Sequence, residues 1–254
     1  MKKHSIILLA IALAFGSCED FLDRQPLTQM TDQNYWTSEN NLRLFANGFY
    51  TNYFVGYNSA FAIDYAPLRG YNFSDDLTST GKQASFETQA PAARGDIREV
   101  IPITSWLIEY AGPTWNFTWV RKSNLLLERI EEMKGVYIED EPYRHWSAVA
   151  RFFRGFEYSR LVSVFGDVPY YDHLLSDDEL EEMYKDRDDR TFVMDKVYDD
   201  FEYVLDNMRV SDGNSQYLNT YIAASFISRL MLFEGTWQKY HLGNNEKATR
   251  YLDL

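Results

Sequence analysis

The segment YRHWSAVARFFRGFEYSRLVSVFGDVP, residues 143–169, decides the fold because it predicts one long helix with a sharp end. Gly166 can take the left-handed conformation that closes a helix, and Pro169 cannot continue one. The same helical spacing of apolar residues recurs on both sides of this segment. The sequence therefore predicts a mainly helical fold.

Four more helices are expected, over residues 37–54, 119–133, 192–208 and 217–241. Thr37 or Ser38 would cap the first of them, and Gly135 would stop the second. Residues 217–241 are apolar nearly all round, which predicts a central helix covered on several sides. A sixth helix is expected after Gly243, capped by Asn244 or Asn245.

The apolar stripe of that sixth helix starts at Ala248, Tyr251 and Leu252 and is unfinished at the end of the sequence. We therefore expect the sequence to be the front portion of a longer protein. Ala150 and Phe152 also recur 74 residues later, as Ala224 and Phe226, each time on the second helix of a predicted hairpin. Repeated helix pairs are typical of tetratricopeptide-type repeats, which adds weak support for such an architecture.

Residues 55–115 fit neither helical nor strand spacing, although they are rich in aromatic residues. Loops of this length are usually functional or disordered, and the aromatic rings argue against disorder. Rings without a place in a helical stripe could stack on sugar rings, while acids, amides and guanidinium groups bond sugar hydroxyls. The candidate ligand-binding residues are Arg69, Tyr71, Asp75, Asp76, Trp106, Tyr110, Trp115 and Asn116. For each of them a structural role remains open, such as a turn, an ion pair or, for Trp115, a place in the core.

Cys18 is the single cysteine of the chain, so it cannot form an internal disulfide. A positive start at Lys2 and Lys3, an apolar run over residues 6–15 and the small pair Gly16 and Ser17 precede it, as in an export signal. The arrangement resembles the lipobox of bacterial lipoproteins, although Phe15 stands where that motif usually has Leu. We expect residues 1–17 to be removed and Cys18 to carry lipid; an ordinary signal peptide with a coincidental cysteine is the alternative.

Charge and composition exclude several classes of function. The sequence has a net charge of −13, and without residues 1–17 it has 23 basic and 38 acidic residues, a charge near −15. Phosphate binding needs a basic footprint, so we do not expect a nucleic-acid partner. No later apolar run is long enough to span a membrane.

No catalytic or metal-binding motif stands out in the sequence. The four histidines show no metal-ligand spacing, and the acid-rich residues 175–190 lack the spacing of a calcium loop. We therefore expect a binding protein without metal or cofactor, and a solvated surface loop at 175–190. A glycoside hydrolase needs only two carboxylates and remains an alternative, as does a helical-repeat interaction scaffold.

Five segments, in order along the chain, resemble the SusD/RagB family of Bacteroidetes lipoproteins. They are CEDFLD, RKSNLLLERI, ARFFRGFEYSRLVSVFGDVPYY, VYDDFEYVLDNM and AASFISRLMLFEGTW. The resemblance implies tetratricopeptide-like helix pairs that support long ligand-binding loops, no catalytic residues, and a length greater than that of this sequence. It also implies a lipid-anchored protein of the cell surface, on the outer membrane. Such a protein binds glycans or other oligomeric nutrients and passes them to a SusC-like TonB-dependent transporter.

Within this family pattern, WNFTWVRKSN (residues 115–124) lies where the ligand-contacting loop enters its helix, which favours Trp115 and Asn116 among the candidates. The expected organisation is a signal peptide at 1–17, a tether at 18–36 and a helical domain at 37–254.

Overall fold

A computed structural model of the protein describes residues 32–54, 115–213 and 217–254, with side chains from residue 34 onward. The chain divides into two units, Met1–Thr37 and Ser38–Leu254. In the first unit the structure describes the short helix α3 (Asp32–Tyr35). The ring of Tyr35, its last residue, meets the ring of Trp36 edge to face. All other described elements belong to the second unit.

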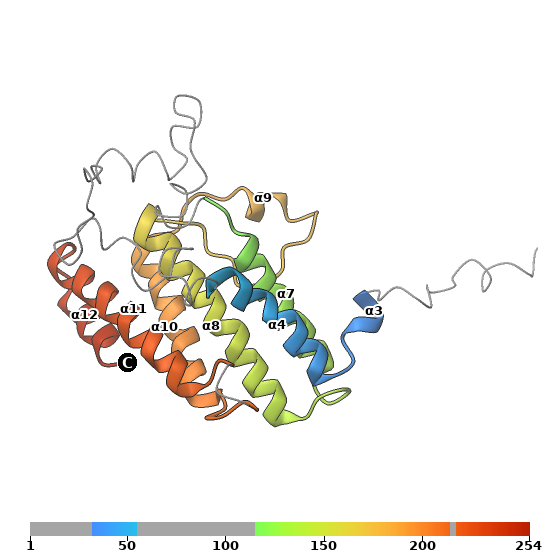
Figure 1. Ribbon diagram of the computed structural model, residues 1–254. Helices are drawn as coiled ribbons and strands as arrows, with labels where there is room; N and C mark the ends of the chain where they lie inside the picture. The colour runs from blue at the N-terminus through green and yellow to red at the C-terminus, as the bar shows by residue number, and fades with distance from the viewer. Residues whose placement is uncertain (1–31, 55–114, 214–216) are drawn as a thin grey trace, which may run out of the picture. The chain divides into compact units, whose positions relative to one another are not determined.

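The second unit consists of helices and their connections in its described residues (Figure 1). Its helices are α4 (Glu39–Tyr53), α7 (Thr118–Met133), α8 (Asp140–Phe165), α9 (Leu180–Met183), α10 (Arg190–Asn207), α11 (Thr220–Tyr240) and α12 (Asn245–Leu252). The expectation of a mainly helical fold is confirmed. Helices α7 and α8 form one pair, and α10 and α11 form another, as tetratricopeptide-like architecture requires.

Helix α8 is the centre of the unit, and α4, α7 and α10 pack around it (Figure 1). Its buried residues lie on every side of the helix, from His145 to Val162. The sequence-based expectation had given this central place to residues 217–241, and this was wrong. Helix α11 packs against α12 and α10, and it leaves Tyr221, Leu232, Phe233 and Tyr240 exposed. High apolar content alone did not distinguish a central helix from one with a bare apolar face.

Aromatic rings fill the space between the helices. Phe49 of α4 stacks on Phe153 of α8 with ring centroids 4.6 Å apart, and Tyr53 lies nearly parallel to Phe153 at 5.6 Å. The hydroxyl of Tyr53 donates a hydrogen bond to Glu157, which is how a buried tyrosine satisfies its polar end. These helical aromatics therefore serve packing rather than ligand binding.

The helix ends follow the residues that the sequence offers for them. Gly166 ends α8 with φ of 72°, a conformation that favours glycine. Asn219 and Asn244 cap α11 and α12 by accepting backbone N–H groups. Helix α8 begins at Asp140, three residues before the expected start, because proline is tolerated in the first turn, where Pro142 lies.

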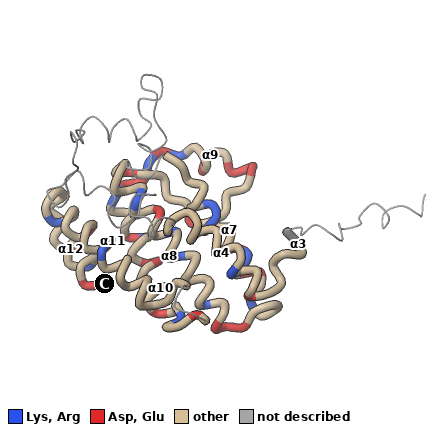
Figure 2. Tube along the Cα trace, viewed as in Figure 1, with Lys and Arg blue, Asp and Glu red and all other residues tan. Residues whose placement is uncertain are grey.

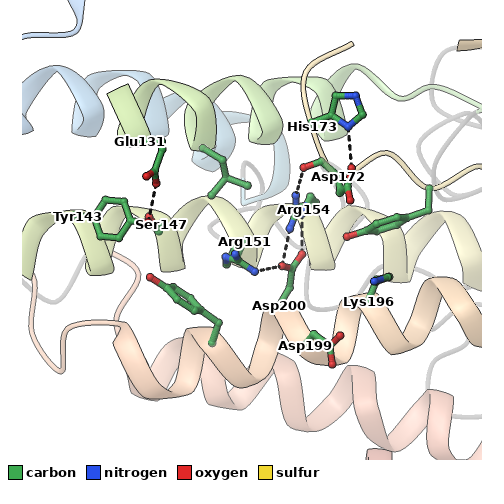
Figure 3. A pocket seen from close by; sticks show the side chains of 13 residues that line it. Glu131, Tyr143, Ser147, Arg151, Arg154, Asp172, His173, Lys196, Asp199 and Asp200 are labelled. Atoms are coloured by element: carbon green, nitrogen blue, oxygen red, sulfur yellow. Dashed lines mark hydrogen bonds and ion pairs between the residues drawn. The ribbon is translucent and has the colours of Figure 1, made fainter. Parts of the chain in front are cut away.

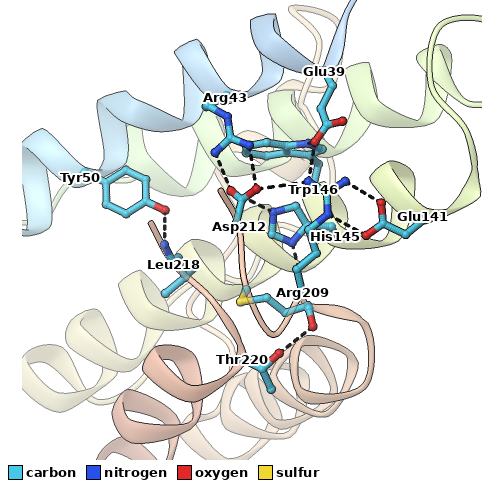
Figure 4. A network of polar contacts seen from close by, with 11 residues as sticks. Glu39, Arg43, Tyr50, Glu141, His145, Trp146, Arg209, Asp212, Leu218 and Thr220 are labelled. Atoms are coloured by element: carbon cyan, nitrogen blue, oxygen red, sulfur yellow. Dashed lines mark hydrogen bonds and ion pairs between the residues drawn. The ribbon is translucent and has the colours of Figure 1, made fainter. Parts of the chain in front are cut away.

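A polar clamp holds α4, the start of α8 and the connection after α10 together (Figure 4). Arg43 of α4 donates two hydrogen bonds to Asp212, and Arg209 donates two to Glu141 of α8 and one to Glu39 of α4. The paired hydrogen bonds from Arg209 hold the pKa of Glu141 below its usual value. We call these five residues, together with His145, the polar clamp.

His145 is the buried member of the polar clamp. Its Nδ1 accepts the backbone N–H of Arg209, and its Nε2 lies 3.5 Å from a carboxylate oxygen of Asp212. Burial, reinforced by the charge of Arg209, lowers the pKa of His145 to about 4. The imidazole is therefore neutral near neutral pH.

Lys and Arg residues lie beside Asp and Glu residues along the same helices (Figure 2). Within the described ranges, none of the helices combines the length and the apolar character needed to cross a bilayer.

Candidate ligand-binding site

Two of the predicted ligand-binding residues, Trp115 and Asn116, fall within the described part of the chain. They lie next to each other immediately before α7. Arg69, Tyr71, Asp75, Asp76, Trp106 and Tyr110 lie outside the described residues, as does Cys18. Their roles remain predictions.

Trp115 is a surface residue, with 41% of its area exposed. Its ring meets Phe117 and Phe165 edge to face at centroid distances of 5.4 and 5.2 Å. The guanidinium carbon of Arg187 lies 4.7 Å from the ring centroid, a cation–π arrangement. The indole is thus fixed in orientation while much of it stays open to solvent, and the core role considered for Trp115 does not apply.

Asn116 has a structural role with capacity left over. Its Oδ1 accepts the backbone N–H of Thr118 at 2.8 Å and so caps the start of α7. Its Nδ2 has no hydrogen-bond partner among the described residues, so two N–H donors remain for a ligand.

Asn116 also lines a groove of about 450 Å³. Its walls are the start of α7, the extended residues after α8 and the end of α9. The lining residues are Asn116, Phe117, Thr118, Val120, Arg121, Asn124, Tyr171, His173, Leu175, Asp177 and Met183. Five of these eleven side chains are apolar or aromatic, and the other six are polar or charged. This mixture and this volume are typical of small-ligand sites. We call this hollow the α7 groove.

Residues 170–173 form one wall of the α7 groove, and two buried polar side chains fix them. Asn124 of α7 donates to the backbone carbonyls of Tyr171 and His173 at 3.0 and 2.8 Å. Arg154 of α8 donates to the carbonyl of Asp172 at 2.8 Å and to Oδ1 of Asn124 at 3.0 Å. In the part of the chain that the structure describes no strand pairs with residues 170–173, and these side chains position the segment instead.

Arg154 is held in turn by Asp200 of α10. The guanidinium donates from Nε and Nη2 to the two carboxylate oxygens at 2.7 Å, and the two side chains are 5% and 2% exposed. Burial by itself lowers the pKa of an arginine, but the charge and hydrogen bonds of Asp200 outweigh it and raise the pKa of Arg154. Arg154 is therefore a permanent cation at the base of the wall.

His173 stands at the top of this wall, where it is exposed. Its ring nitrogens face Asp172 at 2.8 Å and Glu179 at 3.1 Å. Hydrogen bonds to these two carboxylates raise the pKa of His173. The ring is thus oriented by both acids and favours the charged form more than a free histidine does.

Sequence reasoning missed Arg187, Asn124, Arg154 and His173. Arg154 had a detectable signal, because it is a charged residue directly between Phe153 and Gly155 in the aromatic-rich segment ARFFRGF, which also contains Arg151. Arg187 and His173 had none, since their places depend on how the connection between α8 and α10 folds. The acid-rich residues 175–190 make up most of this connection and include the short helix α9. Three of its acids are ion-paired: Glu179 with His173, and Glu182 and Asp188 with Lys185.

The described residues contain no cluster of His, Cys, Asp or Glu suited to a metal ion. The α7 groove offers the amide donors of Asn116 and apolar side chains such as Val120 and Leu175, and the oriented indole of Trp115 immediately precedes Asn116 in the chain. This chemistry is that of reversible binding to a ligand with both apolar faces and hydroxyl groups.

Comparison with known proteins identifies the class to which this fold belongs. A solved SusD homologue from Bacteroides thetaiotaomicron matches with a TM-score of 0.58 and 17% identity, over 88% of this chain and 42% of the other. A structure described as a SusD-like carbohydrate binding protein from Bacteroides vulgatus matches with a TM-score of 0.56 and 17% identity, over 85% and 44%. The helices described above therefore have the SusD-like fold.

The sequence is similar to that of a protein with a related description. The chain is 22% identical over 244 residues to a SusD-like protein of Formosa agariphila, and the match covers 94% of this chain and 44% of the relative. No protein-family model matches the sequence. The chain is thus similar in sequence to a SusD-like protein and shares the fold of SusD-like structures. The chain spans less than half the length of this relative.

Proposed function

We propose that this protein binds glycans or other oligomeric nutrients at the cell surface, without catalysis, and delivers them to a SusC-like TonB-dependent transporter. One observation carries the proposal: Trp115 is an exposed indole whose ring meets that of Phe117, a residue that lines the α7 groove. The apolar C–H face of a sugar stacks on such a ring, and its hydroxyls bond nearby amides.

Relatives support the same proposal at the level of the family. SusD-like proteins include structures described as carbohydrate binding, and the chain shares their fold. The proposal includes removal of residues 1–17 and attachment of the protein to the outer membrane through lipid on Cys18. Residues 18–36 would then be the tether and residues 37–254 the binding domain. The candidates Arg69, Tyr71, Asp75, Asp76, Trp106 and Tyr110 are part of the proposal as further ligand contacts.

The first experiment compares two tryptophans at the start of α7. A glycan panel identifies an oligosaccharide that the chain binds, and calorimetry then measures its affinity for each variant. Trp115→Ala should weaken binding about tenfold, because a stacked ring contributes on the order of 1 kcal/mol or more beyond area burial. It should leave the fold intact, since Trp115 is exposed.

Trp119→Ala is the matched control, because Trp119 packs against Phe49 and Tyr53 inside the unit. It should lower stability clearly more than Trp115→Ala does. Unchanged affinity in Trp115→Ala would contradict the proposed site.

A second experiment separates the two roles of Asn116. Asn116→Asp keeps the oxygen that caps α7 and removes the amide donor. Thermal stability should be retained or slightly raised, since an anion at a helix start is favourable. Glycan affinity should fall. If affinity is unchanged, the amide does not contact the glycan.

Product analysis addresses the glycoside hydrolase alternative. The oligosaccharide that binds should remain intact during prolonged incubation with the chain. Reducing ends that accumulate with time would show that the protein is an enzyme.

A further inference from the structure

A second hollow lies on the other side of the wall formed by residues 170–173 (Figure 3). Its volume is about 540 Å³, and helices α7, α8 and α10 surround it. His173 lines both this hollow and the α7 groove. We call it the polar pocket.

The charged groups at the base of the polar pocket are already paired with one another. Asp200 accepts hydrogen bonds from Arg154 and from Arg151. Asp199 pairs with Arg250 at 3.0 Å, and Asp172 pairs with His173. Because Asp199 and Asp200 each have an arginine beside them and Asp172 has the His173 ring as a hydrogen-bond partner, the base of the pocket does not call for a charged ligand.

Other lining groups have hydrogen-bonding capacity to spare. Among the described residues, the ammonium of Lys196 forms no ion pair and lies 5.6 Å from the ring centroid of Phe192, and the hydroxyls of Ser147, Tyr170 and Tyr203 have no hydrogen-bond partner. Ser147 and Tyr170 are 5% and 6% exposed as whole residues, but their hydroxyl oxygens are not among the buried atoms that lack a partner, so they still face open space. A hydroxyl in this position can exchange its hydrogen bonds to water for hydrogen bonds to a ligand.

The tyrosine rings of the pocket are less available than their hydroxyls. The guanidinium carbon of Arg151 lies 4.5 Å from the ring centroid of Tyr203, and the ammonium of Lys134 lies 3.9 Å from that of Tyr143. The hydroxyl of Tyr143 donates to Glu131, whose carboxylate can still accept from a ligand. The polar pocket thus differs from the α7 groove, since it offers hydrogen bonds in place of an open aromatic face.

We propose that the polar pocket is a second saccharide-binding site, which holds a neutral sugar residue by hydrogen bonds. Sugar hydroxyls both donate and accept, so they match a lining that mixes an ammonium, phenol and alcohol hydroxyls, and a carboxylate. The volume suits one or two sugar residues, within the range of known small-ligand pockets. This site requires neither Trp115 nor the α7 groove.

The test uses the full chain, labelled for NMR, with separate reporters for the two sites. The indole N–H of Trp115 reports the α7 groove, and the backbone amides of Lys196 and Tyr203 report the polar pocket. D-glucose, D-galactose, D-mannose, D-xylose, L-fucose and L-rhamnose are titrated one at a time into the millimolar range, where single sugars are expected to bind. Inorganic phosphate is titrated in the same way. At least one sugar should shift the pocket reporters, and phosphate should not.

Two substitutions then assign the binding to the pocket. Tyr203→Phe and Lys196→Ala should each weaken it about three- to tenfold, as the loss of one hydrogen bond does. Their matched controls are Tyr240→Phe and Lys239→Ala on α11, where both side chains are exposed, and these should have no effect. Equal thermal midpoints would show that all four variants are folded.

Each outcome decides the matter. If no sugar shifts the pocket reporters, or if phosphate alone does, the second site is refuted. A sugar that shifts only Trp115 refutes the second site and leaves the proposed function standing. A sugar that shifts only the pocket reporters supports the second site and counts against binding at the α7 groove. Shifts that survive both substitutions unchanged would also refute the pocket.

Discussion

Arg154→Met should remove much of the stability of the helical unit, because it leaves Asp200 as a buried carboxylate with too few partners. Arg154 donates two hydrogen bonds to Asp200, one to Asn124 and one to the carbonyl of Asp172. After the substitution only Arg151 still pairs with Asp200, which is 2% exposed. Breaking a buried ion pair from one side typically costs about 3–5 kcal/mol. That is a large share of the roughly 5–15 kcal/mol that stabilises a domain.

Arg151→Met is the matched control, since Arg151 lies on the same helix and donates to the same carboxylate. Its side chain is 34% exposed, so its ion pair is screened by water and should contribute about 1 kcal/mol or less. Urea unfolding of both variants, followed by circular dichroism, gives the two losses directly. Equal losses, or a loss below about 1 kcal/mol for Arg154→Met, would refute the reasoning.

The double substitution Arg154→Met with Asp200→Leu keeps the test informative if the single variant does not fold. Replacing both charges by apolar side chains leaves no unpaired carboxylate and should recover part of the lost stability. Glycan binding should not recover, because the carbonyl of Asp172 still lacks its donor and the wall shared by the two hollows is loosened.

Three further predictions concern other parts of the chain. Gly155→Ala should destabilise the protein by about 1–3 kcal/mol, since a Cβ there would lie 2.6 Å from the ring of Phe201. Gly48→Ala in α4 meets nothing within 4 Å and should stabilise the protein by about 0.5–1 kcal/mol. Thermal unfolding of both variants separates the two effects, and equal shifts of the midpoint would contradict this packing. As the pH decreases from 6.5 to about 4, the unfolded chain takes up a proton at His145 while the folded chain does not, so the free energy of unfolding decreases by on the order of 3 kcal/mol. His145→Gln should flatten this part of a profile of urea midpoint against pH, and an unaltered slope would show that burial does not perturb the histidine. Cys18→Ala should abolish metabolic labelling with palmitate, and labelling that persists in the variant would rule out the proposed lipid anchor.

Local signals in the sequence were sufficient to predict most of the helices. Apolar spacing located α4, α7, α8, α10 and α11 within a few residues at each end, and Gly166, Asn219 and Asn244 act where such residues usually act. The start of α8 was placed too late, at Tyr143. The burial of α11 was overestimated, because sequence alone does not show which apolar faces find a neighbour.

The candidate site was predictable only where the signal was local. Trp115 was a candidate because its ring has no place in an apolar stripe and Asn116 because it is a polar group beside that ring, and the resemblance of residues 115–124 to the SusD/RagB pattern favoured both. The pairing of Arg154 with Asp200 joins residues 46 apart, and the contact of Arg187 with Trp115 depends on the path of an irregular connection. These contacts follow from tertiary packing, so no spacing rule reveals them.

The polar clamp has a consequence for the order in which the chain acquires its structure. Arg43 and Asp212 are 169 residues apart, and Glu39 and Arg209 are 170 apart. When a chain emerges from the ribosome or an export channel with its N-terminus first, α4 appears long before Arg209 and Asp212. Helix α4 therefore lacks its charged partners until these two residues have also emerged. Contacts between α7, α8 and α10 close much shorter loops, and short loops lose less entropy on closure. We expect those three helices to assemble first and α4, the earliest helix of this unit to be synthesised, to dock last.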